Sequence, residues 1–131
     1  MQETQTFTIY ERLPGLNELI AAAKRPMGRA NKDGLRWGSY SQLKREWVNK
    51  ILGRLKHLKK VHRAYFKFSW YEGNRKRDPD NIAAAGRKII LDALVMSGTL
   101  KNDGWSHVQG WEDHFYVDRD KPRVEVDVIP L

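Results

Sequence analysis

Two aspartates flank a proline in the segment Asp78-Pro79-Asp80, and three basic residues precede them. Pro79 restricts the residue before it to an extended conformation. Alternate side chains of an extended segment point the same way, so we expect the two carboxylates to lie close together. Such a pair repels unless a cation lies between them, and carboxylate oxygens suit magnesium or manganese. The segment therefore predicts a metal site beside phosphate-binding cations, which are Arg75, Lys76 and Arg77.

A purely structural role for this segment is also open. Asp-Pro-Asp-Asn is a favourable turn and helix start, and Asp80 can cap the helix that follows. A third acid, Asp103, lies beyond that helix, which spans roughly 24 Å. Asp103 therefore reaches Asp80 only if the loop after the helix folds back and Asp103 enters a strand paired with the strand before the turn.

Hydrophobic periodicity predicts the elements that position these acids. Strands are expected at 4–10, 61–71, 108–117 and 123–129, with the last two forming a hairpin across residues 118–122. Helices are expected at 16–23, from Ser39 or Ser41 to about Lys59, and at 81–96. Between the first two helices lies a long basic loop that ends at Gly38. This order predicts one α+β domain over residues 1–131, with two main helices packed on a small mixed sheet.

Composition excludes several classes of protein. The 131 residues include no cysteine, which excludes a disulfide scaffold, a thiol nucleophile and a cysteine-ligated metal site. No run of about 18 apolar residues exists, and the first residues do not have the pattern of a secretory signal. We therefore expect a cytoplasmic protein without a membrane partner.

Charge divides the chain into two unlike parts. Residues 1–77 hold 18 basic and 6 acidic side chains, whereas residues 78–131 hold 6 basic and 10 acidic ones. A basic segment suits a polyanion, because each neutralised phosphate releases condensed counterions. The acidic part needs another explanation, and holding a metal cation against that polyanion is one. The charge pattern thus favours nucleic-acid binding.

Three motifs, in this order, resemble the RusA family of Holliday junction resolvases, in particular phage and prophage members from Gram-positive bacteria. The motifs are Arg77-Asp78-Pro79-Asp80-Asn81, Leu91-Asp92-Ala93-Leu94, and Gly98-Thr99-Leu100-Lys101-Asn102-Asp103. The resemblance implies a homodimeric α+β endonuclease. It also implies symmetrical cleavage of four-way DNA junctions with magnesium, for which manganese is a possible substitute.

The same resemblance assigns roles to particular residues. It makes Asp78, Asp80 and Asp103 the catalytic, metal-binding carboxylates. It also implies a catalytic lysine in the helix, for which Lys88 is the candidate and Arg87 the alternative. Separately from the resemblance, a role for Asp113 as a further carboxylate stays open. The expected DNA contacts are Lys24, Arg25, Arg29, Arg36, Arg75, Lys76 and Arg77.

Two other functions remain open from the sequence. A non-catalytic basic DNA-binding module would not need the acids. A metal-dependent nuclease acting on other branched DNA or on RNA would keep the metal site but not the preference for junctions. None of the three functions involves a small-molecule substrate.

Overall fold

The computed structural model describes residues 2–23 and 39–131, and the predicted DNA contacts Lys24, Arg25, Arg29 and Arg36 lie outside that range. No helix within it is both long and apolar enough to cross a membrane. The elements are β1 (Gln5–Ile9), α1 (Leu16–Ala23), α2 (Ser39–Ile51), the 3-10 helix η1 (Leu52–Leu55), β2 (Ala64–Glu72), α3 (Pro79–Met96), β3 (Val108–Val117) and β4 (Arg123–Pro130). The predicted α+β class and mixed sheet are confirmed.

The four strands form one sheet in the order β1-β4-β2-β3. β2 pairs with β3 in parallel, whereas β4 is antiparallel to both β1 and β2. The predicted hairpin between the last two strands is therefore wrong, because β2 lies between β3 and β4. The connection 118–122 passes the end of β2, where the Asp118 amide donates to the Glu72 carbonyl at 2.8 Å. A strand–helix–strand unit such as β2-α3-β3 favours parallel pairing, since the helix returns the chain to the starting edge.

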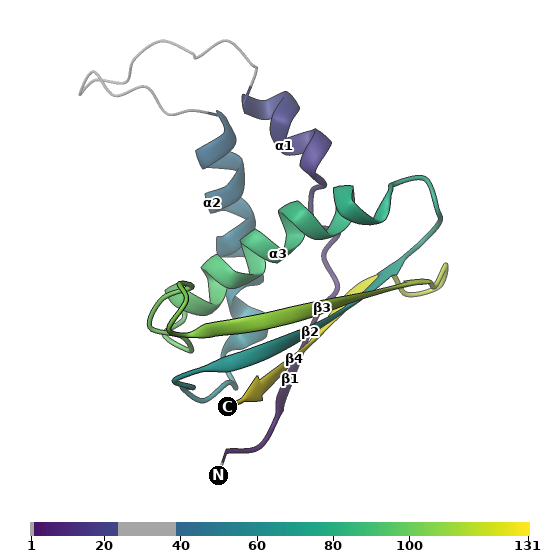
Figure 1. Cartoon of the computed structure of the whole chain (residues 1–131). Coiled ribbons are helices and arrows are strands. Elements are labelled where there is room, and N and C mark those ends of the chain that lie inside the picture. The colour runs from purple at the N-terminus through teal and green to yellow at the C-terminus, as the bar shows by residue number, and fades with distance from the viewer. Residues whose placement is uncertain (1, 24–38) are drawn as a thin grey trace, which may run out of the picture.

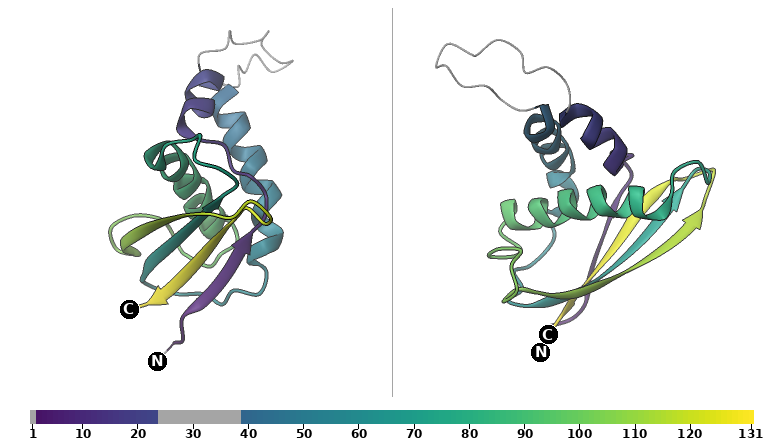
Figure 2. Two further views of the ribbon diagram at one scale, coloured as in Figure 1. Left: turned by 90° about the vertical axis from the view of Figure 1, so that its right-hand side faces the viewer. Right: turned by 45° about the horizontal axis from the view of Figure 1, so that its top comes forward.

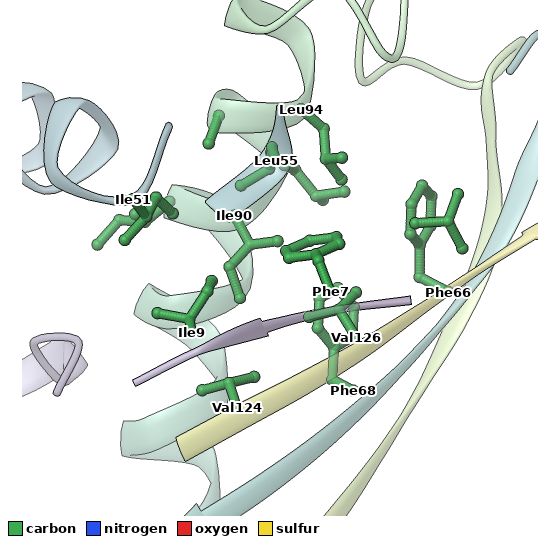
Figure 3. Packing of buried hydrophobic residues seen from close by; sticks show 14 of the residues in the cluster. Phe7, Ile9, Ile51, Leu55, Phe66, Phe68, Ile90, Leu94, Val124 and Val126 are labelled. Carbon is green, nitrogen blue, oxygen red and sulfur yellow. The ribbon is translucent and has the colours of Figure 1, made fainter. Parts of the chain in front are cut away.

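The helices lie on one side of the sheet, and α3 crosses over its strands (Figures 1 and 2). The residues of β2 that face this helical layer are fully buried aromatics, namely Phe66, Phe68 and Trp70. Their rings stack at centroid distances of 6.2 and 5.7 Å. Valines of β4 and apolar residues of α3 complete the core (Figure 3). The opposite face of the sheet, which we call the open face, carries mainly polar and charged side chains.

Helix α2 is shorter than predicted. It ends at Ile51 and continues as a 3-10 turn to Leu55, whereas the sequence predicted a helix to about Lys59. Gly53 lies in that turn, and glycine disfavours a helix interior by about 1 kcal/mol. The Gln5 side chain binds both backbone groups of Lys59, at 2.7 and 2.9 Å. These hydrogen bonds keep the chain non-helical as it approaches β2.

Candidate metal and nucleic-acid site

Asp78 and Asp80 lie at the start of α3, where the chain leaves β2. Asp78 is the N-cap residue, with the extended backbone that Pro79 demands (φ −71°, ψ 150°), and its side chain does not cap the helix. Asp80 belongs to the first turn of the helix, so the prediction of an extended segment through both aspartates is wrong. The helix begins at Pro79 because proline suits the first helical position. Both aspartates are exposed.

A largely buried arginine holds this turn in place. The guanidinium of Arg77 forms two hydrogen bonds to the Glu72 carboxylate, at 2.9 and 3.0 Å, and a third to the Leu13 carbonyl at 3.0 Å. Its side chain is only 13% exposed. These contacts join the end of β2 and the segment before α1 to the turn. Arg77, predicted as a DNA contact, therefore has the geometry of a positioning residue.

Asn81 connects the same turn to α1. Its side-chain oxygen accepts a hydrogen bond from the Asn17 amide at 2.8 Å. A Cβ atom at Gly15 would lie only 2.7 Å from the Asn81 side chain, so a larger residue there would force that side chain to shift. The starts of α1 and α3 are thus fixed against each other, a relation that the sequence did not reveal.

Two cations next to the aspartates remain exposed. Arg75 and Lys76 lie in the loop before the helix, and neither side chain has an ion pair in the part of the chain that the structure describes. A groove of about 600 Å³ passes between this loop and the last residues of β3. Arg75 and Asp78 line one wall of the groove and Phe115 the other. The turn therefore presents both signs of charge beside a groove.

Asp103 lies in the loop that follows α3, at the other end of that helix. The loop folds back under α3, because Leu100 is buried in the core and its amide donates to the Leu94 carbonyl at 3.1 Å. The Thr99 carbonyl accepts a hydrogen bond from the Val61 amide at 2.9 Å. Asp103 does not enter β3, which begins five residues later at Val108. The fold-back thus occurs, but it brings Asp103 to the second half of α3.

There Asp103 belongs to a group of alternating charges, which we call the lysine cluster. Lys88 Nζ lies 2.9 Å from the Asp103 carboxylate and 3.0 Å from that of Asp92, which also pairs with Lys44 of α2 at 3.2 Å. The hydrogen bond to Asp103 raises the pKa of Lys88 and lowers that of Asp103. The sequence signal for this cluster was the spacing of four residues from Lys88 to Asp92, which places both on one helix face.

The three predicted metal ligands do not meet within one chain. Asp103 contacts Lys88, which follows Asp80 by eight residues and so lies about 12 Å along the helix. No group of three or more acidic or histidine side chains suited to a metal occurs within residues 2–23 and 39–131. Asp78 and Asp80 offer two exposed carboxylates within one turn, and magnesium often takes one or two protein carboxylates and completes its shell with water and phosphate.

Asp113, left open as a further carboxylate, is fully occupied by protein groups. One oxygen accepts the Trp70 indole N–H at 2.9 Å, and the other pairs with Arg87 at 2.5 Å. The guanidinium of Arg87 also lies over the ring of Trp111, 4.7 Å from its centroid. Arg87 and Asp113 therefore join α3 to the sheet.

Ion pairs account for most of the acidic charge after residue 77. Six of its ten acids pair with a cation or histidine: Asp92, Asp103, Glu112, Asp113, Asp118 and Glu125. Asp127 instead accepts a hydrogen bond from Thr6. Asp78, Asp80 and Asp120 have no such partner among the described residues. Of these three, only Asp78 and Asp80 lie in the same turn and next to exposed cations. This distinguishes the turn from the rest of residues 78–131.

Comparison with known proteins adds no relative. No family model matches the chain, and no curated protein matches it. The resemblance to RusA resolvases therefore stays a prediction from the three motifs.

Proposed function

We propose that the protein is a magnesium-dependent endodeoxyribonuclease that resolves four-way DNA junctions in the cytoplasm of a bacterial cell. The observation that carries the proposal is the turn before α3, where Asp78 and Asp80 are exposed and form no ion pair with any residue that the structure describes. Adjacent carboxylates repel, so their exposure together favours a cation-binding role. The preference for four-way junctions comes from the sequence motifs.

In this proposal the acidic residues of the turn bind the magnesium ion and its exposed basic residues bind DNA. Asp78 and Asp80 would hold magnesium, which would polarise the scissile phosphate and lower the pKa of a bound water. Arg75 and Lys76, which are both exposed, would bind phosphates of the same strand. Arg77 keeps its charge inside the turn and fixes the backbone that carries the two aspartates.

Lys88 has a separate place in this proposal. Asp80, Ala84, Lys88 and Asp92 follow one another at intervals of four residues, so they form a stripe on one face of α3. Ala84 is exposed and small, which leaves the middle of the stripe open. Lys88, oriented by Asp92 and Asp103, would bind a phosphate further along the strand. In this proposal Asp103 orients Lys88 and does not bind the metal.

Junction resolution also requires two cuts in opposing strands. A four-way junction is nearly two-fold symmetric, so a two-fold dimer supplies two equivalent sites at a fixed separation. Homodimerisation is therefore part of the proposal.

Cleavage of a synthetic four-way junction, with and without magnesium, tests the proposal. Asp80→Asn should lower the cleavage rate by more than about 100-fold and leave junction binding intact, because the amide keeps the shape but loses the charge. Asp120→Asn is the matched control, since it removes the same charge from an exposed site in the 118–122 connection. It should cleave at the rate of the unmodified protein.

Other results of the cleavage assay would favour one of the two alternative functions. Equal cleavage of linear duplex would leave a nuclease without junction preference. Binding without cleavage in the unmodified protein, at any magnesium concentration, would indicate a non-catalytic DNA-binding module. Unchanged cleavage by Asp80→Asn would remove the catalytic role of the turn.

A further inference from the structure

Two aromatic side chains of the edge strand β3 lie on the helical side of the sheet but outside the core. The register with β2 places Trp111 opposite Phe66 and Phe115 opposite Trp70. Those two partners in β2 are fully buried, whereas Trp111 is 46% exposed and Phe115 is 38% exposed. Neither of the exposed rings is part of the hydrophobic core. This edge therefore presents aromatic surface that the packing of the chain does not use.

Helix α3 lies over the sheet that ends at β3, and it passes both rings (Figure 1). The guanidinium of Arg87 lies 4.7 Å from the ring centroid of Trp111. Asp80, seven residues before Arg87, lies on nearly the same face of the helix, because seven residues complete almost two turns. At the start of the helix, Phe115 and Asp78 line opposite walls of one groove. The face of α3 from the turn to Arg87 thus runs beside β3 from Phe115 back to Trp111.

The helix and the strand offer different chemistry over a similar length. Trp111 and Phe115 are about 13 Å apart along the strand. Asp80 and Arg87 are about 10 Å apart along the helix. Exposed cations, Arg75 and Lys76, lie at the end of this path. A ligand that fits both sides carries flat apolar groups on one side and anions on the other, which describes a strand of nucleic acid.

We propose that an unpaired DNA strand lies between α3 and β3, with its bases stacked on Trp111 and Phe115 and its backbone along the helix. The choice of DNA rests on the proposed function. Stacking on aromatic rings is tolerant of sequence, since every base has a π-face. Bases of a duplex are held between their neighbours, whereas those of an unpaired strand can turn onto the rings. The site therefore takes a strand whose base pairs have opened, as they do at a branch point.

The open face of the sheet is less suited to the same ligand. Tyr116, the residue after Phe115, stacks on Tyr71 at a centroid distance of 4.8 Å. The guanidinium of Arg123 lies 3.8 Å from the centroid of the same Tyr71 ring. The rings on that face are therefore already paired within the chain. Carboxylates that would repel phosphates also lie there, namely Glu112, Glu125 and Asp127.

Binding of a labelled single-stranded oligothymidylate to the full chain, in EDTA and followed by fluorescence anisotropy, tests the proposal without cleavage. The single strand should bind more tightly than a blunt duplex of the same length. Phe115→Ala and Trp111→Ala should each weaken binding of the single strand at least about fivefold, because stacking on a base is lost. Phe115→Tyr keeps the ring and should bind like the unmodified protein, whereas Phe115→Leu keeps only the apolar volume and should bind like Phe115→Ala.

Tyr10→Ala is the matched control, because it removes a comparably exposed ring that follows β1, at the opposite edge of the sheet. It should bind the single strand like the unmodified protein. A second measurement needs no variant: an oligonucleotide that contains 5-iodouracil, bound to the unmodified protein and irradiated, should crosslink to Trp111 or Phe115. Crosslinks only at other residues, tighter binding of the duplex, or equal losses in Tyr10→Ala and Phe115→Ala would each overturn the proposal.

The results also separate this proposal from the proposed nuclease. Cleavage of junctions together with unchanged strand binding in Phe115→Ala would overturn the stacking site and leave the nuclease. Strand binding that depends on Phe115 in a protein that never cleaves would support the stacking site and remove the nuclease.

Discussion

The two ends of α3 use acidic side chains in opposite ways. In the turn before the helix, Asp78 and Asp80 are exposed and carry no ion pair in the described structure. In the lysine cluster, at the second half of the helix, Asp92 and Asp103 share Lys88 at 3.0 and 2.9 Å. Paired carboxylates contribute to stability, whereas adjacent unpaired ones repel and can be satisfied by an added cation. The comparison therefore separates acids that position other residues from acids that can take a ligand.

The largest effect on stability is expected from removing Arg77, which holds the turn before α3 in place. Arg77→Ala removes three hydrogen bonds and leaves the Glu72 carboxylate, 20% exposed, without its partner. We expect the free energy of unfolding to fall by about 2–3 kcal/mol, measured by urea denaturation. Junction cleavage should fall as well, because the two aspartates lose their fixed backbone. An unchanged unfolding midpoint would contradict the positioning role of Arg77.

A smaller effect is expected in the lysine cluster. Asp103→Asn should lower the free energy of unfolding by about 0.5 kcal/mol, since Asp103 and Lys88 are 34% and 48% exposed and solvent screens the pair. The folded-state pKa of Asp103 is lowered from 3.8 and that of Lys88 is raised from 10.5. The contribution is therefore present at neutral pH, and it is lost as the pH falls through the Asp103 pKa or rises through the Lys88 pKa. Denaturation at pH 7 and pH 3 should give a smaller difference in stability for the variant than for the unmodified chain.

The smallest effect on stability is expected at Arg75. Arg75→Ala removes an exposed side chain that has no ion pair among the described residues, so the free energy of unfolding should change by less than about 0.5 kcal/mol. If Arg75 binds a phosphate, DNA affinity should fall, and the slope of log affinity against log salt should decrease by about 0.9. Equal salt slopes for the two proteins would show that the exposed cation of the turn does not contact DNA.

Much of the fold follows from local sequence, because alternation and helical periodicity report which side of an element is buried. Val124, Val126 and Val128 alternate with polar residues, and the strand predicted there is confirmed as β4. The sheet order was missed because adjacency along the chain favoured a hairpin. The relevant signal was the strand–helix–strand sequence that ends at the half-exposed aromatics of β3.

The candidate site was predictable only in part. The Asp78-Pro79-Asp80 segment indicates a helix start with exposed acids, and Pro79 fixes where that helix begins. Asp103 could not be placed, because the path of its loop depends on the burial of Leu100 and on backbone hydrogen bonds to Val61. Such contacts between distant segments leave no periodic pattern in the sequence.

Magnesium titration of the folded chain without DNA, followed by amide chemical shifts in NMR spectra, tests the central claim most directly. The account predicts saturable shifts at Asp78, Asp80 and Asn81, with the amide of Asp103 unaffected because Lys88 already neutralises that carboxylate. It also predicts that Asp80→Asn abolishes the shifts, whereas Asp120→Asn retains them. Saturable shifts at Asp92 and Asp103 with none at the turn would contradict the account, because the metal would then bind where the lysine cluster lies.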